Sequence, residues 1–171
     1  LAPPVVISGV STVSLANNQI TVDLTGTFSQ ALNGDYRFLA VVVEDSVTGT
    51  TAAYNQSNSY GNGANGPMGG FENFGTTVPA ASMNYNFVGR ALLNTFGGQS
   101  GSLPGAITSG GAYNYQFTTT ANAAWDKSQL WIAAVVINTS TGAVLNANKF
   151  PVVITTGLND QNNPLVGSYL Y

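Results

Sequence analysis

Hydrophobic and polar residues alternate along much of the chain, and this pattern predicts β-strands. Residues 19–28 (QITVDLTGTF) and 112–119 (AYNYQFTT) alternate with a period of two, which indicates strands with one buried face. Residues 5–15 (VVISGVSTVSL) are rich in β-branched side chains, which favour strands. Gly9 interrupts this segment and is interpreted as a bulge or bend.

Two further segments are apolar almost without interruption. Residues 36–45 (YRFLAVVVED) and 129–138 (QLWIAAVVIN) are typical of strands that are covered on both faces. Turn residues such as Asn33-Gly34-Asp35 and Thr141-Gly142 separate the segments. The pattern predicts about eight strands and no long helix. We therefore expect an all-β fold, an antiparallel β-sandwich of jelly-roll or Greek-key type.

The domain organisation expected from this pattern is a single β-sandwich domain over residues 1–171. Its two ends, residues 1–15 and 157–171, are interpreted as extended, strand-like termini.

The segment 46–79 differs from the rest because it has no sustained period. It is rich in Gly, Asn, Ser and Thr and holds four aromatic residues, Tyr54, Tyr60, Phe71 and Phe74. Long loops in compact domains are often functional, and aromatic side chains among Gly and Asn are typical of adaptable binding surfaces. These four residues are therefore candidate ligand-binding residues. The alternative is that they anchor the loop on the sandwich.

Charged residues make up 6% of the chain, against about a quarter in an ordinary globular protein. Such a surface lacks the like-charge repulsion that keeps copies of a protein apart. The four basic residues are scattered, which argues against a nucleic-acid partner. The longest apolar runs are too short for a transmembrane helix, so no transmembrane segment is expected.

The chain contains no histidine and no cysteine. It therefore lacks the commonest general base, the commonest metal ligand and any thiolate nucleophile. No recognisable pair of carboxylates or Ser-Lys arrangement replaces them. We expect a protein that is not an enzyme and has no catalytic residues, no cofactor and no metal site.

Several short motifs occur in a characteristic order. They are LAVVVED (39–45), NFVGRAL (86–92), YNYQF (113–117) and VLNA (144–147), with Gln56 after the first. In order and spacing they resemble the C-terminal β-domain of the twenty-eight-kilodalton outer-membrane-protein family of Bacteroidetes, over roughly residues 35–150. The resemblance implies a secreted or cell-surface protein, associated with the outer membrane, with an adhesin or receptor role.

The acidic end of the first motif holds the candidate structural ion pair. Glu44 and Asp45 are adjacent, so along a strand they point to opposite faces and make a poor acid–base pair. We expect one of them to pair with Arg90, with Ca²⁺ ligation as the alternative. Ser46 lies in Asp45-Ser46-Val47, which resembles the short O-glycosylation pattern used in Bacteroidetes, and is the candidate glycosylation site.

Two functions follow as hypotheses. In the first, copies of the chain form a homopolymer, a filament or surface layer, because apolar ends add as strands to a neighbouring sheet. The residues assigned to this contact are Val5, Val6, Ile7, Val166, Tyr169 and Tyr171. The alternative for these ends is that both pair inside their own domain. In the second function, a monomeric adhesin or glycan-binding module uses the 46–79 loop on a cell-surface ligand, with carbohydrate as one candidate.

Overall fold

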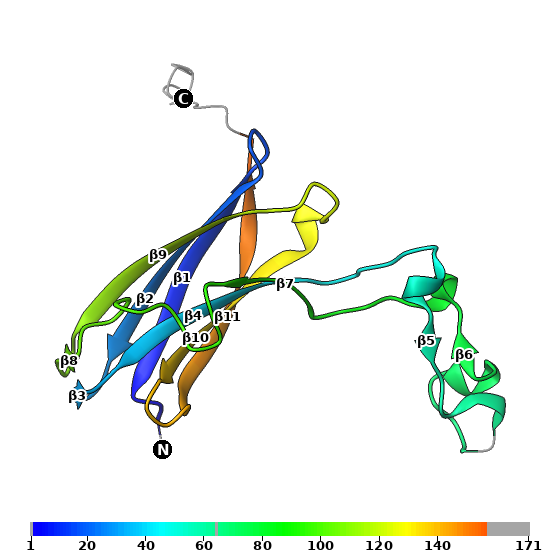
Figure 1. Cartoon of the computed structure of the whole chain (residues 1–171), viewed down its shortest axis with the longest axis horizontal. Helices are drawn as coiled ribbons and strands as arrows, with labels where there is room; N and C mark the ends of the chain where they lie inside the picture. Colours follow the sequence, from blue (N-terminus) through cyan, green and yellow to red (C-terminus); the bar gives the residue numbers. More distant parts are fainter. Residues whose placement is uncertain (1, 64, 157–171) are drawn as a thin grey trace, which may run out of the picture. The chain divides into compact units, whose positions relative to one another are not determined.

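The computed structural model describes residues 2–63 and 65–156, and the fold is all-β, as predicted (Figure 1). Its helical elements in this part of the chain are 3₁₀ turns of three residues each. The strands are β1 (Val5–Ser14), β2 (Gln19–Phe28), β3 (Leu32–Asn33), β4 (Tyr36–Glu44), β5 (Gln56–Ser57), β6 (Thr77–Val78), β7 (Val88–Leu93), β8 (Ala106–Ile107), β9 (Ala112–Thr120), β10 (Leu130–Asn138) and β11 (Val144–Thr155).

Seven strands form one curled sheet in the order β7-β4-β10-β11-β1-β2-β9. The predicted antiparallel arrangement is wrong at one place, because β1 pairs with β11 in parallel. One mixed sheet also takes the place of the two packed sheets of a jelly-roll or Greek-key sandwich. Alternation of side chains fixes which face of a strand is buried, but it does not fix the direction of the neighbouring strand.

The core lies on the inner face of the curled sheet. Alternate residues of β1, β2 and β10 are buried there, as the period of two predicts. Phe28, Phe38 and Ile132 are completely buried, and each such side chain contributes about 1.5–3 kcal/mol relative to leaving it exposed. The buried face therefore stabilises the sheet in a chain that has no cysteine for disulfides.

The chain clusters into two compact units. The sheet unit comprises residues 2–42 and 91–156 of the described chain, and the inserted unit comprises residues 43–90. In the inserted unit β5 pairs with β6, and 3₁₀ turns flank this short ladder. The unit includes the whole aromatic segment 46–79. No helix in the described ranges has the length and apolar character needed to cross a bilayer.

Candidate functional site

The first candidate residues, Glu44, Asp45 and Arg90, lie in the inserted unit. Arg90 Nε donates a hydrogen bond of 2.6 Å to Glu44 Oε2. The Glu44 side chain is only 5% exposed, whereas that of Arg90 is 24% exposed. Burial of a carboxylate is costly unless a positive charge and hydrogen bonds accompany it. Glu44 and Arg90 thus form a structural ion pair, while Asp45 bonds elsewhere.

Asp45 belongs to a backbone clasp formed by residues 45–47 and 85–87. Asp45 Oδ1 accepts a hydrogen bond from the backbone N–H of Phe87, at 2.7 Å. In return, Asn86 Oδ1 accepts one from the backbone N–H of Ser46, at 3.0 Å. Val47 and Tyr85 exchange both backbone hydrogen bonds. The clasp joins the start and the end of the inserted unit.

Ser46 is exposed, with φ of 58° in the left-handed region, and it lies at the bend of the clasp. The next residue, Val47, is buried. A hydroxyl on an exposed bend is accessible to a modifying enzyme, so glycosylation of Ser46 stays a prediction with compatible geometry.

The four aromatic residues of segment 46–79 do not form one cluster. Tyr60 and Phe71 are exposed at 46% and 42% and line a hollow of about 240 Å³. Phe74 packs against Phe71, with ring centroids 6.3 Å apart. The Tyr54 ring instead lies against Gly49. The backbone carbonyl oxygen of Tyr54 accepts a hydrogen bond from the Tyr85 hydroxyl. Tyr60 and Phe71 are therefore placed for contact with a ligand, and Tyr54 is placed to anchor the segment.

The hollow beside Tyr60 and Phe71 is mainly apolar. Met68, Val78 and Met83 complete its apolar lining. Two amides also line it: Asn58 Nδ2 donates to the carbonyl oxygens of Phe71 and Gly75, and Gln56 Nε2 donates to that of Ser57. A ligand would therefore be held here mostly through apolar contact.

Glu72 organises the turn that carries Met68 and Phe71. Its Oε2 accepts hydrogen bonds from the backbone N–H groups of Met68 and Gly70, at 2.8 and 2.9 Å. The hydrogen bond from its own backbone N–H, followed by those from Met68 and Gly70, lowers the pKa of the Glu72 carboxyl below its ordinary value of 4.5. The ionised carboxylate thus stabilises the rim of the hollow.

The N-terminal assembly candidates Val5, Val6 and Ile7 lie in β1, a strand inside the sheet. β1 pairs along its length with β2, and residues Ser11–Ser14 pair with β11. Where β1 and β11 diverge, Asn146 and Asn148 donate side-chain hydrogen bonds to the carbonyl oxygens of Val5 and Ile7. Within the described residues β1 has no open edge to add to another sheet. Val166, Tyr169 and Tyr171 lie outside the described residues.

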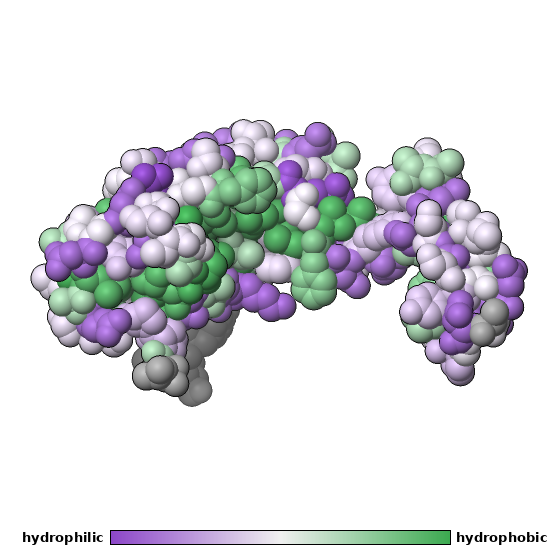
Figure 2. All heavy atoms as spheres, turned by 60° about the horizontal axis from the view of Figure 1, so that its bottom comes forward, coloured by the Kyte–Doolittle hydropathy of each residue, from purple (hydrophilic) through white to green (hydrophobic). Residues whose placement is uncertain are grey.

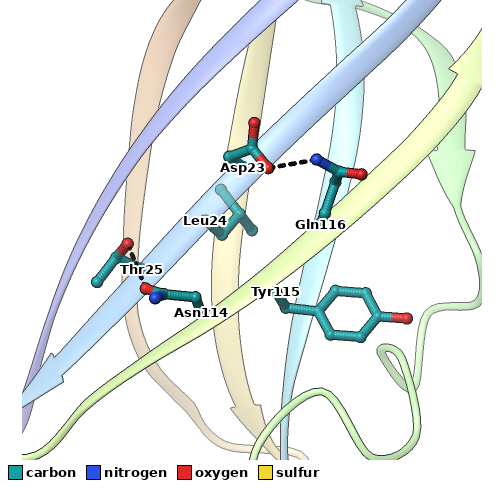
Figure 3. Close-up of a pocket in the computed structure, with 6 residues that line it drawn as sticks. All are labelled: Asp23, Leu24, Thr25, Asn114, Tyr115 and Gln116. Carbon is teal, nitrogen blue, oxygen red and sulfur yellow. Dashed lines mark hydrogen bonds between the residues drawn. The ribbon is translucent and has the colours of Figure 1, made fainter.

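Among residues 2–63 and 65–156, the strands at the two open edges of the seven-stranded sheet are β7 and β9. In the described ranges β9 pairs with β2 alone, over nine consecutive residue pairs with no bulge. Cross-strand bonds pin its outer face, from Gln116 Nε2 to Asp23 Oδ1 (2.7 Å) and from Thr25 Oγ1 to Asn114 Oδ1 (2.8 Å). Figure 3 shows these four side chains on one side of the strands, around a shallow hollow. The polar atoms of these side chains bond to each other across β2 and β9, and β9 forms a regular edge.

Both open edges line a further hollow of about 310 Å³, which is called the edge hollow below. Leu92 and Leu93 of β7 contribute to it, together with residues 115–119 of β9. Asn94 and Gln99, from the connection after β7, complete the lining. The sheet thus curls far enough to bring its two ends to one hollow, but the ends do not pair.

The fold and these features define an all-β domain with open sheet edges and an inserted unit. Residues 4–155 match the family model described as outer membrane protein Omp28. The chain therefore belongs to the Omp28 outer membrane protein family and is a cell-surface protein associated with the outer membrane. This confirms the family resemblance and the expected localisation.

One solved structure with a similar fold is a domain of the outer membrane lipoprotein Omp28 from Porphyromonas gingivalis. The TM-score is 0.53 with 11% sequence identity, and the match covers 91% of this chain and 93% of that chain. At this identity the likeness concerns the fold. No curated protein sequence matches the chain significantly.

Sequence reasoning missed several residues of these surfaces. Met68 and Met83 of the apolar hollow are not aromatic, and the sequence pattern does not single them out. The open edge at β9 was also missed, although residues 112–120 contain no charged residue and no proline. Such residues normally protect an edge, so their absence was the available signal.

Proposed function

We propose that this chain is a non-catalytic surface subunit that assembles with copies of itself through strand addition. The observation that carries the proposal is the open edge of β9. An edge strand exposes unpaired backbone N–H and C=O groups and is a template for another strand. Soluble proteins usually blunt such edges with charge, proline or a bulge. β9 has nine residues and carries none of these devices.

The composition of the chain supports the same proposal. Four basic and seven acidic residues leave a formal net charge of −3 on 171 residues. Little electrostatic repulsion opposes the approach of two copies. On the face drawn in Figure 2, hydrophobic residues are concentrated on the sheet unit, while the visible surface of the inserted unit is mostly polar or neutral. The sheet unit is thus the part suited to contact between copies.

The test places a charge on the edge and the same charge away from it. Thr118→Lys adds a lysine to the exposed edge of β9, whereas Ser8→Lys adds one to an exposed position of the interior strand β1. Sedimentation velocity and electron microscopy over a concentration series should show assemblies for the native chain and for Ser8→Lys. Thr118→Lys should remain monomeric. A native chain that stays monodisperse at all concentrations would reject the proposal.

A second candidate function, ligand binding, is supported by the hollow of the inserted unit. Tyr60 and Phe71 are exposed aromatic side chains, and a turn held by Glu72 positions one of them. Aromatic faces stack on the apolar faces of sugar rings, so a cell-surface carbohydrate stays among the proposed ligands. The satisfied amide of Asn58 favours a ligand that contributes apolar surface.

Glycan-array binding by the intact chain tests this second function. Replacing both aromatic residues, by Tyr60→Ala and Phe71→Ala, should abolish binding, whereas Tyr60→Phe should retain it because the ring is kept. Equal binding by the double alanine variant would reject this role for the hollow.

A further inference from the structure

The edge hollow has the features of a receptor for an extended segment. In an antiparallel ladder only every other residue bonds to a given neighbour, so β9 presents a row of unused backbone donors and acceptors on the side away from β2. A strand laid along this side would pair with them. A compact or helical ligand could not, because its own backbone groups are already bonded.

Half-buried side chains flank the buried core beside this edge. Phe117 is 6% exposed, and the neighbouring Tyr115 is half-buried and packs edge-on against it, with ring centroids 4.9 Å apart. Leu92 of β7 lies half-buried at the same hollow. An added strand would cover these side chains with its own alternate residues. The lining of the edge hollow is mostly polar and holds no charged side chain, so the best occupant is an extended segment with little charge that pairs mainly through its backbone.

We infer that residues 165–171 of a second copy occupy the edge hollow as a strand beside β9. This inference rests on the proposed self-assembly and identifies its contact. The segment reads LVGSYLY, with no charge and no proline. It follows the end of β11 at Thr155 by nine intervening residues, which span roughly 30 Å when extended. Such a linker is long enough to reach a neighbouring molecule.

The chain leaves the sheet at the end of β11, and β1 and β2 lie between β11 and β9. Thr155 lies opposite Ser14 at the end of β1, and β2 separates β1 from β9. To reach its own edge hollow the chain would have to cross the ends of β1 and β2 and reverse direction. When each copy instead donates the segment to the next copy, the repeated contact is head-to-tail and does not close on itself. The result is a filament.

Cysteine crosslinking tests the contact cleanly, because the chain has no cysteine of its own. Protein carrying Thr118→Cys on β9 is mixed with protein carrying Ser168→Cys, and a short thiol-to-thiol crosslinker is added under assembling conditions. The control mixture replaces Thr118→Cys with Ser8→Cys on the interior strand β1. Mass spectrometry identifies dimers that contain one chain of each kind.

The expected result is a several-fold excess of mixed dimers for the Thr118→Cys mixture over the control. Equal yields would overturn the inference. A double variant, Thr118→Cys with Ser168→Cys, should crosslink between chains and lose this product on dilution. Efficient crosslinking within one chain at high dilution would show that the segment occupies its own edge hollow, and this also overturns the inference.

Deletion separates the inference from the function on which it rests. Removal of residues 165–171 should abolish assembly, and excess synthetic peptide covering residues 160–171 should inhibit assembly of the native chain. If the shortened chain still assembles, the inference fails and the proposed function stands. If the native chain never assembles, the proposed function itself fails.

Discussion

At the scale of single residues, the buried carboxylate of Glu44 is the charge that most needs its partner. Arg90→Met keeps much of the apolar stem and removes the positive charge. Breaking a fully buried pair costs roughly 3–5 kcal/mol. Because the Arg90 side chain is 24% exposed, we expect a smaller loss of about 2 kcal/mol in the free energy of unfolding. Urea denaturation measures this loss.

The matched control is the second ion pair, in which Arg37 donates to Asp35 and the two side chains are 25% and 48% exposed. Solvent screens an exposed pair, so it contributes little to stability. Arg37→Met should therefore cost clearly less than Arg90→Met. Equal losses in the two variants would mean that burial of Glu44 does not set the strength of its pair.

The Glu72 turn predicts a pH dependence in the inserted unit. Backbone hydrogen bonds lower the pKa of Glu72 in the folded state, so the stabilisation is present above the ordinary value of 4.5 and is lost as the pH falls through the lowered pKa. The methyl resonance of Met68 should shift in NMR spectra as acid is added below that value. In Glu72→Gln this shift should be absent. A Met68 titration that is the same in Glu72→Gln would show that ionisation of Glu72 does not hold this turn.

The residue pairing was partly predictable from the sequence. With eleven charged residues in the chain, few partners were available for Arg90, which made an ion pair with an acidic strand end a strong hypothesis. The bond from Phe87 to Asp45 could not be predicted in this way. It depends on left-handed backbone at Ser46 and Phe87, with φ of 58° and 60°, and non-glycine residues rarely adopt that conformation.

At the scale of elements, Gly9 shows how a strand is fitted to its neighbour. Of the bulge or bend expected at Gly9, the bulge is wrong, because the register with β2 continues through Gly9 without a shift. A Cβ at this position would instead lie 2.6 Å from Phe150 Cζ and 2.9 Å from the Asp23 carbonyl oxygen. The glycine makes room for the Phe150 ring, which packs against the core.

Gly9→Ala should therefore destabilise the sheet by about 1–3 kcal/mol, because the added methyl group overpacks the core. Gly89→Ala is the control, since Gly89 lies in strand β7 and a Cβ added there would meet no atom within 4 Å. That variant should be neutral or slightly stabilising. Thermal unfolding compares the two, and an equal effect would contradict the packing role of Gly9.

Periodicity predicted the strands well but not their neighbours. The alternation in 19–28 and 112–119 correctly indicated β2 and β9 and their buried faces. The parallel contact between β1 and β11 joins residues about 140 positions apart, such as Ser11 Oγ and the Pro151 carbonyl oxygen. Nothing local in the sequence encodes a contact of that range. The sheet order, and with it the open edges, therefore required the structure.

At the scale of the whole molecule, the low charge and the open sheet edge act together. An edge without protective residues would be a hazard in a protein that must stay monomeric. In the proposed assembly, the same edge is the contact between copies. Both termini were expected to supply strands to a neighbouring copy. The N-terminal strand β1 instead lies inside its own sheet, between β11 and β2. The C-terminal segment then remains as the donor in the proposed contact.

Amide hydrogen exchange of the native chain, measured below and above the concentration at which it assembles, tests whether copies meet at β9. The predicted result is slower exchange on assembly for residues 112–120 of β9, because added hydrogen bonds protect the amide groups that face away from β2. Exchange in the interior strand β1 should not change. Assembly that leaves the exchange of β9 unaltered would contradict the claim that this edge is where copies of the protein meet.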